Sequence, residues 1–509
     1  MKRLGIIDIG SNSICMDVIQ MNDDGSFKLI DEVKESVRLG DGLNDSEMIS
    51  DDKMRHAIDT LQFFTELAQA LSVDHMICTA TEAVRRASNR SVFLDAAKKQ
   101  LGLEIRLLTG TEEAYYDYIG AVNSMNLPDC LIMDIGGNST EIIKVIDNDI
   151  VHSVSLPIGS IMISQMFHLE KSFDDQVMAK MHNFIKEQFR EIDWIYGVDT
   201  LIGIGGSFRN LAKVHQKKVN YPLDLIHNYE MKPVSAAEIY STFKGLSEEE
   251  RKKVKGLSKD RADIFSGALA EILVLLDMTG ISDLIISGSG LRDGLFYDWL
   301  LGEKIAGNKD VFSFSIQNAM NNYGLNQNHA KQVWSIAQQL YHQLQKELGI
   351  NSTRMKILKA AALLHDSGIN INYFDHHKHA FYMILNSRLY GLTHKELVMT
   401  AWTASIHRKS VMKVPGPFHS FLSNDEILTV QQLGVLLQIA ESLDRRQNAN
   451  IYRIQSTVHP EFIKIIITAK TNPCLELRDV QNARQNFKKV FKKQLIIESS
   501  TLEACTFRT

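Results

Sequence analysis

The sequence predicts an α/β protein of two similar lobes, followed by a helical domain and a small α/β tail. Three observations support this prediction. The tripeptide Asp-Ile-Gly at residues 8–10 recurs at 134–136, and each copy lies between two apolar segments of strand length. The pattern becomes helical from about residue 306, and strand-like segments return near residue 455. The expected domains are residues 1–125, 126–305, 306–455 and 456–509.

The first lobe begins with a predicted β-hairpin, in which a small polar turn joins two apolar strands. The strands cover residues 4–9 and 14–19, and the turn covers residues 10–13. Apolar residues at helical spacing then predict helices over 53–71, 93–101 and 112–122, and short apolar runs predict strands over 75–79 and 105–108. The mixture of strands and helices indicates an α/β lobe.

The second lobe repeats this opening. A predicted strand at 130–135, a turn at 136–140 and a strand at 141–146 match the first hairpin. Two strand–turn–helix segments follow, LIGIGGSFRNLA at 201–212 and DLIISGSGLRDGLF at 283–296. A repeat of this kind implies two lobes that face each other across a cleft.

The remainder of the chain changes character twice. Residues 311–450 are helical in pattern and rich in leucine, alanine, glutamine and histidine. Predicted strands at 462–470 and 494–498 then flank a basic helix within residues 481–493. The rear of the chain is therefore a helical domain with a small α/β tail.

Charge divides the chain into an acidic front and a basic rear. The net charge is −5, yet residues 301–509 contain 25 Lys and Arg against 15 Asp and Glu, while residues 1–300 contain 31 against 46. A basic half could hold a polyanion near an acidic half that supplies metal-binding carboxylates. The split is explained equally well by two solvated surfaces whose opposite charges have no function. A sequence pI near 6.4, without helix-turn-helix, zinc-finger or stacking-aromatic patterns, argues against a nucleic-acid partner.

Composition also bounds the cellular setting. Hydrophobic residues make up 44% and charged residues 23%, which is typical of a folded globular chain. No run approaches 18 apolar residues, and Asp8 interrupts the first apolar segment, so we expect neither a membrane span nor a signal peptide. The five cysteines include no CxxC pair and predict no cysteine zinc site. We expect a cytoplasmic protein.

The two polar turns suit phosphate. In DIGSNS at 8–13 and DIGGNST at 134–140, small residues leave backbone N–H groups open to an anion, and hydroxyl and amide groups add donors. The aspartate beside each turn repels phosphate, but it can hold a divalent cation or orient a bridging water. A single turn of this type is usually a plain hairpin, whereas two copies and a third GIGGS turn at 203–207 indicate function.

Five ordered motifs resemble those of the Ppx/GppA phosphatases: DIGSNS at 8–13, TGTEEA at 109–114, DIGGNSTE at 134–141, GIGGSFRNLA at 203–212 and SGSGLRDGL at 287–295. The resemblance covers essentially the whole chain, because VRLGDGL at 37–43 and ATEAVRRASN at 80–89 match further segments. It implies an actin-like fold (ASKHA, ribonuclease H-like) and the activity of an exopolyphosphatase or a guanosine pentaphosphate phosphohydrolase. Asn138 departs from the pattern, since the family usually has glycine there.

The resemblance also implies roles for individual residues. Glu113 would be the general base, and Asp134, Glu141 and Asp8 would hold Mg²⁺ or Mn²⁺ and the attacking water. Arg85 would bind the anionic chain, as would Arg38, and a monovalent cation could assist. The residues implied to bind phosphate are Gly10, Ser11, Asn12, Ser13, Gly136, Gly137, Asn138, Ser139, Gly205, Gly206 and Ser207.

Hydrolysis of a phosphoanhydride requires a carboxylate that deprotonates water and positive charge for the phosphoryl oxygens. Glu112 and Glu113 both begin a predicted helix, so either could be this base. Both are also favoured at that position by the helix dipole alone. The family pattern favours Glu113, the second of the pair, and leaves Glu112 as a structural N-terminal carboxylate.

A second candidate site lies in the helical region. His329, the pair His365-Asp366, and Asp444 follow an order that resembles the HD-domain metal phosphohydrolases. Neutral imidazoles and carboxylates can converge on a divalent metal. Additional donors are His376, His377, His379 and His407.

The role of this region stays open at the level of sequence. In the Ppx/GppA family an HD-like domain often serves as a scaffold that binds polyphosphate. A metal site, a second hydrolytic activity and a scaffold with helix-packing histidines are all compatible with the residues. The basic pairs at 445–446, 488–489 and 492–493 favour the scaffold, because they could follow a chain of phosphates.

The preferred interpretation is processive removal of terminal orthophosphate from inorganic polyphosphate with Mg²⁺. Hydrolysis of guanosine pentaphosphate (pppGpp) in the same cleft is the alternative, and a polyphosphate-binding or sensing protein is the non-enzyme alternative. Retention of Glu113, Glu141 and both Asp-Ile-Gly turns argues against the last. A homodimer would fit the family.

Overall fold

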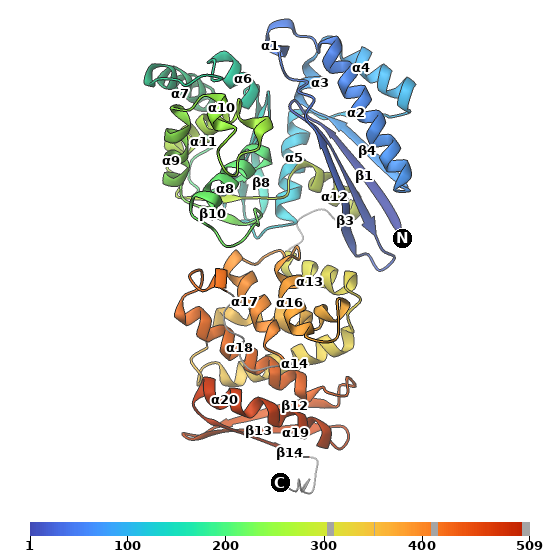
Figure 1. Cartoon of the computed structure of the whole chain (residues 1–509), viewed down its shortest axis with the longest axis vertical. Helices are drawn as coiled ribbons and strands as arrows, with labels where there is room; N and C mark the ends of the chain where they lie inside the picture. Colours follow the sequence, from blue (N-terminus) through green and yellow to red (C-terminus); the bar gives the residue numbers. More distant parts are fainter. Residues whose placement is uncertain (303–309, 351, 409–415, 501–509) are drawn as a thin grey trace. The chain divides into compact units, whose positions relative to one another are not determined.

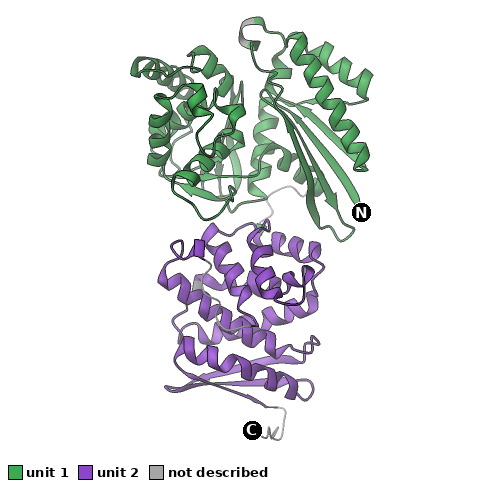
Figure 2. Ribbon diagram, viewed as in Figure 1, with its two compact units in different colours: residues 1–311 green, residues 312–509 purple. Residues whose placement is uncertain are grey.

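The computed structural model describes residues 1–302, 310–350, 352–408 and 416–500, with two compact units over residues 1–311 and 312–509 (Figure 2). The boundary that the sequence places near residue 305 lies outside the described residues. Within the described part, no helix combines the length and the apolar character needed to cross a bilayer.

The first lobe of unit 1 contains a five-stranded mixed sheet (Figure 1). Its strands are β1 (Lys2–Ile9), β2 (Ile14–Met21), β3 (Phe27–Glu35), β4 (His75–Ala80) and β5 (Arg106–Leu107), in the order β3-β2-β1-β4-β5. β1 and β2 form the predicted antiparallel hairpin, in which Ile9 pairs with Ile14 across the turn. β4 runs parallel to β1, so both strands end at the same edge of the sheet.

Helices of the first lobe follow the predicted pattern. They are α1 (Leu43–Ser46), α2 (Asp51–Ala70), α3 (Glu82–Arg86), α4 (Arg90–Ala96), which continues into a π-helical turn (Ala97–Leu101), and α5 (Gly110–Val122). α2 buries an apolar stripe that includes Leu61 and Phe64, and two aspartates in its first turn favour its N-terminus. α5 begins at a capping box between Thr109 and Glu112.

The second lobe repeats the first sheet. Its strands are β6 (Cys130–Ile135), β7 (Thr140–Ile146), β8 (Asp149–Leu156), β9 (Thr200–Ile204), β10 (Tyr229–Met231) and β11 (Asp283–Ile286), in the order β10-β11-β9-β6-β7-β8. The run β8-β7-β6-β9-β11 has the order and strand directions of β3-β2-β1-β4-β5. The prediction of two similar α/β lobes is therefore confirmed.

The helices that follow in unit 1 are α6 (Ser160–Met166), α7 (Asp175–Arg190), α8 (Gly205–Lys218), α9 (Pro233–Lys244), α10 (Glu248–Arg251), α11 (Phe265–Thr279) and α12 (Leu291–Leu301). α12 belongs to the segment that the sequence assigns to the second lobe, yet it packs against α5 and β1 of the first lobe. The ring centroids of Phe296 and Phe27 lie 4.6 Å apart. The chain thus returns to the first lobe before unit 1 ends.

Unit 2 begins with a helical bundle, as predicted. Its helices are α13 (Val311–Asn322), which begins at the unit boundary, α14 (Gln327–Leu344), α15 (Met355–Leu364), α16 (His376–Leu385), α17 (His394–Ser405) and α18 (Asn424–Leu443). A three-stranded sheet follows, with β12 (Ile451–Val458), β13 (Phe462–Ala469) and β14 (Gln494–Ser499), together with α19 (Cys474–Asp479) and α20 (Arg484–Phe491). β12 was not predicted, because its exposed, polar-rich alternation lacks a long apolar run.

Candidate active site

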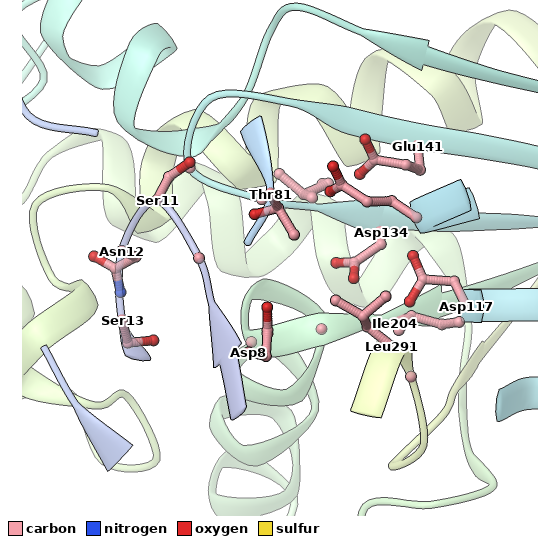
Figure 3. A pocket seen from close by; sticks show the side chains of 18 of the residues that line it. Asp8, Ser11, Asn12, Ser13, Thr81, Asp117, Asp134, Glu141, Ile204 and Leu291 are labelled. Atoms are coloured by element: carbon pink, nitrogen blue, oxygen red, sulfur yellow. The ribbon is translucent and has the colours of Figure 1, made fainter. Parts of the chain in front are cut away.

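The two hairpin turns of unit 1 border one cavity of about 160 Å³ (Figure 3). Its walls come from both lobes, since β1, β2, α5 and α12 supply some lining residues and β6, β7 and α8 supply others. Of the predicted site residues, those that line the cavity are Asp8, Gly10, Ser11, Asn12, Ser13, Glu113, Asp134, Gly136, Gly137, Ser139, Glu141, Gly205 and Gly206. Arg38, Arg85, Asn138 and Ser207 are not among them.

The two turns have the same backbone geometry. The Gly10 N–H donates to the Ser13 carbonyl over 3.1 Å, and the Gly136 N–H donates to the Ser139 carbonyl over 2.9 Å. They also touch, because a Cβ on Gly137 would lie 2.8 Å from Ser11 Cβ. The predicted phosphate-binding turns of the two lobes are thus adjacent.

Asn138 fits its turn because of a glycine in the other lobe. Its side-chain oxygen lies 2.0 Å from the position that a Cβ on Gly40 would occupy. Gly40 is held there by its N–H, which donates to the Ser11 carbonyl over 2.8 Å. The side-chain amides of Asn12 and Asn138 are buried without a hydrogen-bond partner in the described chain. Burying such groups is costly, so the Asn12 amide, which lines the cavity, is suited to contact a bound ligand.

Besides Asp293, which caps α12, five carboxylates line the cavity: those of Asp8, Glu113, Asp117, Asp134 and Glu141. Figure 3 shows Asp117, Asp134 and Glu141 gathered on one side, with Asp8 projecting from β1. Asp8 Oδ1 and Asp117 Oδ1 are buried without a hydrogen-bond partner among the described residues. Hard oxygen donors left without partners in this way suit a divalent cation such as Mg²⁺ or Mn²⁺.

Burial perturbs all five carboxyl groups. It raises the pKa of Asp8 to about 6 and that of Glu113 to about 8, although Arg292 and Arg85 respectively oppose the shift. Burial and neighbouring carboxylates raise the pKa values of Asp117 and Glu141 well above their ordinary range. Such concentrated negative charge is stabilised by protons or by a cation, which is typical of a functional site.

Glu113 and Glu112 occupy different environments, although they are adjacent in sequence. The Glu112 carboxylate accepts from the Thr109 backbone N–H over 2.8 Å and pairs with Arg106, so it serves as the helix cap. Glu113 is 6% exposed and faces the cavity. The position of Glu113 therefore suits a base, and that of Glu112 does not.

Arg85 lies beside Glu113. Its guanidinium donates to the carboxylates of Glu113 and Glu82 and to the Leu108 carbonyl. Arg38 is likewise paired, with Asp263. The structure thus places both predicted anion-binding arginines in ion pairs.

Three other arginines do line the cavity. The guanidinium of Arg261 packs against Gly206, because a Cβ on Gly206 would lie 2.2 Å from Arg261 Nη2. Burial raises the pKa of Asp134, and the positive charges of Arg209 and Arg261 oppose this rise. Arg292 pairs with Asp17 and also with Glu32, at 2.9 Å. Arg209 and Arg261 therefore offer positive charge to an anion in the cavity.

The predicted GIGGS turn forms the start of α8. Gly205 has φ +80°, and a Cβ there would lie 2.1 Å from Asp134 Oδ1, so only glycine fits. Ser207 is buried, and its hydroxyl donates to the Ile135 carbonyl over 3.4 Å. Gly205 and Gly206 therefore border the ligand space, while Ser207 supports the neighbouring strand.

Sequence reasoning missed several lining residues, namely Thr81, Asp117, Arg209, Arg261 and Arg292. Asp117 lies four residues after Glu113 on α5, so helical spacing could have revealed it. Arg209 lies within the motif GIGGSFRNLA at 203–212, and Arg292 lies within SGSGLRDGL at 287–295. Arg261 is the last residue of a short 3₁₀ segment (Lys259–Arg261), and no local pattern indicates its role.

A buried carboxyl outside the cavity gives a stability prediction. Glu271 on α11 accepts from the Thr140 hydroxyl over 2.7 Å, and burial raises its pKa from 4.5 to about 8. The folded state therefore keeps the proton that the unfolded chain releases above pH 4.5. The contribution of Glu271 to the free energy of unfolding is therefore fully present below pH 4.5. It is lost as the pH rises from 4.5 to about 8, by up to about 1.4 kcal/mol per pH unit.

Glu271→Gln is accordingly expected to raise the melting temperature at pH 8.5 and to change it little at pH 5, because glutamine stays neutral. Thermal unfolding of both proteins at the two pH values measures the difference. An equal shift at both pH values would contradict the assignment, since a simple packing effect does not depend on pH.

The structure also brings together the four predicted residues of the helical region, within unit 2. His329, His365, Asp366 and Asp444 form a buried cluster that additionally contains His376, His407 and Glu441. His379 and His377 are not members of either candidate metal group in the described chain.

Comparisons with known proteins identify relatives of both units. The model of the Ppx/GppA phosphatase family matches residues 18–303, and that of Ppx/GppA phosphatase domain III matches residues 311–485. Two relatives are named guanosine-5'-triphosphate,3'-diphosphate pyrophosphatase. The protein from Pseudoalteromonas atlantica is 30% identical over 401 residues, or 76% of each chain. That from Pseudoalteromonas translucida is 29% identical over 468 residues, or 90% of this chain and 88% of the relative.

Solved structures resemble about three fifths of the chain. An exopolyphosphatase from Cytophaga hutchinsonii is 27% identical with a TM-score of 0.56, over 60% of this chain and 100% of that one. A Ppx/GppA family member from Aquifex aeolicus is 27% identical with a TM-score of 0.52, over 59% of this chain and 98% of that one.

Proposed function

Because the chain belongs to the Ppx/GppA phosphatase family, we propose that it is an exopolyphosphatase, which hydrolyses the terminal phosphoanhydride bond of inorganic polyphosphate. One observation carries the proposal. Two phosphate-suited turns, five carboxylates and two available arginines surround the same small cavity. This combination supplies anion binding, metal binding and a base, which are the requirements of phosphoryl transfer to water.

The carboxylates of the cavity fit a divalent cation. Asp8, Asp134 and Glu141 would hold Mg²⁺ or Mn²⁺, and the unpartnered oxygen of Asp117 adds a further donor. When bound, the ion supplies positive charge to the phosphoryl oxygens.

The protein's own residues then divide the remaining work. The turns bind the terminal phosphate through N–H and hydroxyl groups, and Arg209 and Arg261 neutralise charge on its oxygens. Glu113 orients a water molecule toward the phosphorus atom and accepts its proton. Arg85 positions the Glu113 carboxylate and opposes the rise of its pKa, which keeps more of the base ionised near neutral pH. Orthophosphate leaves, and the shortened chain retains the bridging oxygen.

Polyphosphate is the preferred substrate because the described lining residues include no aromatic side chain that could stack on guanine. Hydrolysis of pppGpp is the second candidate, since the two Pseudoalteromonas relatives carry that activity in their names. Both substrates end in a phosphoanhydride, so the same cavity chemistry serves either.

Phosphate release from long-chain polyphosphate and from pppGpp, measured in parallel with Mg²⁺, tests the proposal. A higher kcat/KM for polyphosphate supports it, and a higher value for pppGpp favours the second candidate. Binding of polyphosphate without release of phosphate from either substrate would instead indicate a sensor.

Asp134→Asn is expected to raise the Mg²⁺ concentration needed for half-maximal activity by roughly tenfold or more, because a charged oxygen donor is lost. Activity measured across a Mg²⁺ titration checks this. Asp293→Asn is the matched control, since Asp293 lines the same cavity but its carboxylate accepts from the Gly290 N–H over 3.2 Å as a helix cap. A wild-type titration for Asp134→Asn would show that Asp134 is structural.

A further inference from the structure

An ion pair joins the two lobes of unit 1, and the chemistry of the cavity does not use it. The Nη2 atom of Arg38 donates to both carboxylate oxygens of Asp263, over 2.7 and 2.6 Å, and to the Asp260 carbonyl over 3.2 Å. The two paired residues are 225 positions apart in the chain. Their side chains are only 26% and 24% exposed, so solvent screens this pair less than it screens a surface pair.

Arg38 belongs to the strap, residues 37–42, which lies between β3 and α1. On either side of Arg38, Val37 and Leu39 are each 1% exposed and belong to the apolar core of the first lobe. Arg38 itself has φ +57°, a left-handed conformation that residues other than glycine rarely adopt. Such a conformation persists only where its surroundings fix it, so the strap presents the Arg38 guanidinium in one place.

The strap also supports the two turns that border the cavity. The Arg38 N–H donates to the Asn12 carbonyl over 2.9 Å, and the Gly40 N–H donates to the Ser11 carbonyl. Gly40 further provides the space that the Asn138 side chain of the second lobe fills. A displacement of the strap would therefore move the first turn and disturb the packing of the second.

The other half of the ion pair lies beside a cavity residue. Asp263 follows Arg261 by two positions, and Arg261 lines the cavity and packs against Gly206. Ala262 and Ile264, on either side of Asp263, are 0% and 3% exposed, which fixes this segment in the second lobe. The ion pair therefore connects the phosphate-suited turn of one lobe to a cavity arginine of the other.

Arg38 is already neutralised where it lies. Its Nη1 is 4.0 Å from the Asp41 carboxylate, in addition to the contact with Asp263. Arg38 is also not among the lining residues of the cavity. A phosphate group could contact its guanidinium only by displacing Asp263, so the geometry favours a contact between the lobes over a contact with substrate.

From these contacts we propose that Arg38 and Asp263 are positioning residues, which form a latch that holds the lobes closed around the terminal phosphate. While the latch is closed, Arg261 of the second lobe and the turn at residues 10–13 of the first lobe keep a fixed separation. Catalysis depends on such placement, because a group displaced by about 1 Å loses much of its effect. The effect on turnover rests on the proposed hydrolysis, whereas the latch itself is a property of unit 1.

Kinetics of phosphate release by the full chain test the effect on turnover. Arg38→Gln and Asp263→Asn are each expected to lower kcat/KM for polyphosphate by roughly tenfold. The double variant is expected to lose the same amount rather than roughly a hundredfold, because both substitutions remove one contact. Lys34→Gln is the matched control, since Lys34 pairs with Asp260 across the same lobes over 2.8 Å but is 40% exposed. An exposed pair contributes little, so we expect near wild-type kcat/KM in this control.

Two results would overturn the proposal. If Arg38 instead contacted the substrate, Asp263→Asn would release the guanidinium and remove a negative charge, so it would tighten polyphosphate binding while Arg38→Gln weakened it. Opposite effects of the two single variants therefore exclude the latch. A lower melting temperature with wild-type kcat/KM in both variants would show that the pair only stabilises the fold.

Hydrogen–deuterium exchange of the ligand-free chain gives a readout that needs no substrate. Exchange of the strap amides, which include the Arg38 and Gly40 N–H groups, is expected to be roughly threefold or more faster in Asp263→Asn than in the wild-type chain. Unchanged exchange in folded Asp263→Asn would refute the latch. Faster exchange in a chain that releases no phosphate would support the latch and refute the proposed function, so the two failures are distinguishable.

Discussion

Replacing Glu113 by glutamine is expected to lower turnover by about two to four orders of magnitude while leaving substrate binding nearly unchanged. Glutamine preserves the shape of the side chain and its contact with Arg85, but it cannot accept a proton from water. Steady-state kinetics on polyphosphate, together with equilibrium binding of the same polymer, separate the two effects. Turnover close to that of the wild-type protein would remove Glu113 from the mechanism.

Glu112→Gln is the matched control for this experiment. The residue is adjacent and has the same charge, but its carboxylate caps α5 and pairs with Arg106 rather than facing the cavity. We expect near-normal turnover and a small loss of stability, of about 1 kcal/mol. A large loss of turnover in this variant alone would transfer the role of base to Glu112.

A chain that ends at residue 311 is expected to hydrolyse short polyphosphates at a rate comparable to the full chain, but to bind long ones roughly 10- to 100-fold more weakly. Residues 312–509 contain 23 Lys and Arg against 13 Asp and Glu, so they can hold a long polyanion while unit 1 cleaves its end. Unit 1 is a compact unit by itself, which makes the shortened chain a reasonable test protein. Affinity as a function of polymer length and salt measures the effect.

Two checks accompany the truncation. The shortened chain must first be shown to be folded and soluble, because newly exposed apolar surface would cause aggregation and distort the kinetics. In the full chain, Lys488→Gln with Lys489→Gln removes two exposed charges from α20 without a cut, and we expect weaker long-chain binding and a shallower salt dependence. A truncated chain that still prefers long polymers would refute the division of labour between the units.

The parts of the fold that could be predicted are those with local signals. The hairpins of β1–β2 and β6–β7 were readable because apolar strands flank short Gly-Ser turns, and α2 because its apolar stripe has helical spacing. β12 and the return of α12 to the first lobe could not be predicted, because both depend on packing against distant segments.

The residues of the candidate site also divide into those that local motifs reveal and those that only the fold brings together. Residues of the turns and Glu113 of α5 were found because they belong to contiguous motifs, whereas Asp117 of α5 lies beyond its motif. Arg261 was missed because only folding brings its short 3₁₀ segment against Gly206. Asn138 was a departure in sequence, and its accommodation depends on Gly40, which is 98 positions away and in the other lobe.

The packing of α12 on α5 determines how the two lobes can move. The chain passes between the lobes after α5 and again before α12, so both connections lie at this helix pair. The two backbones touch there, since a Cβ on Gly120 would lie 2.5 Å from the Gly290 carbonyl oxygen. We therefore expect any relative rotation of the lobes to take place about this helix pair. Because the cavity has walls from both lobes, such a rotation would widen or narrow the space around a bound ligand.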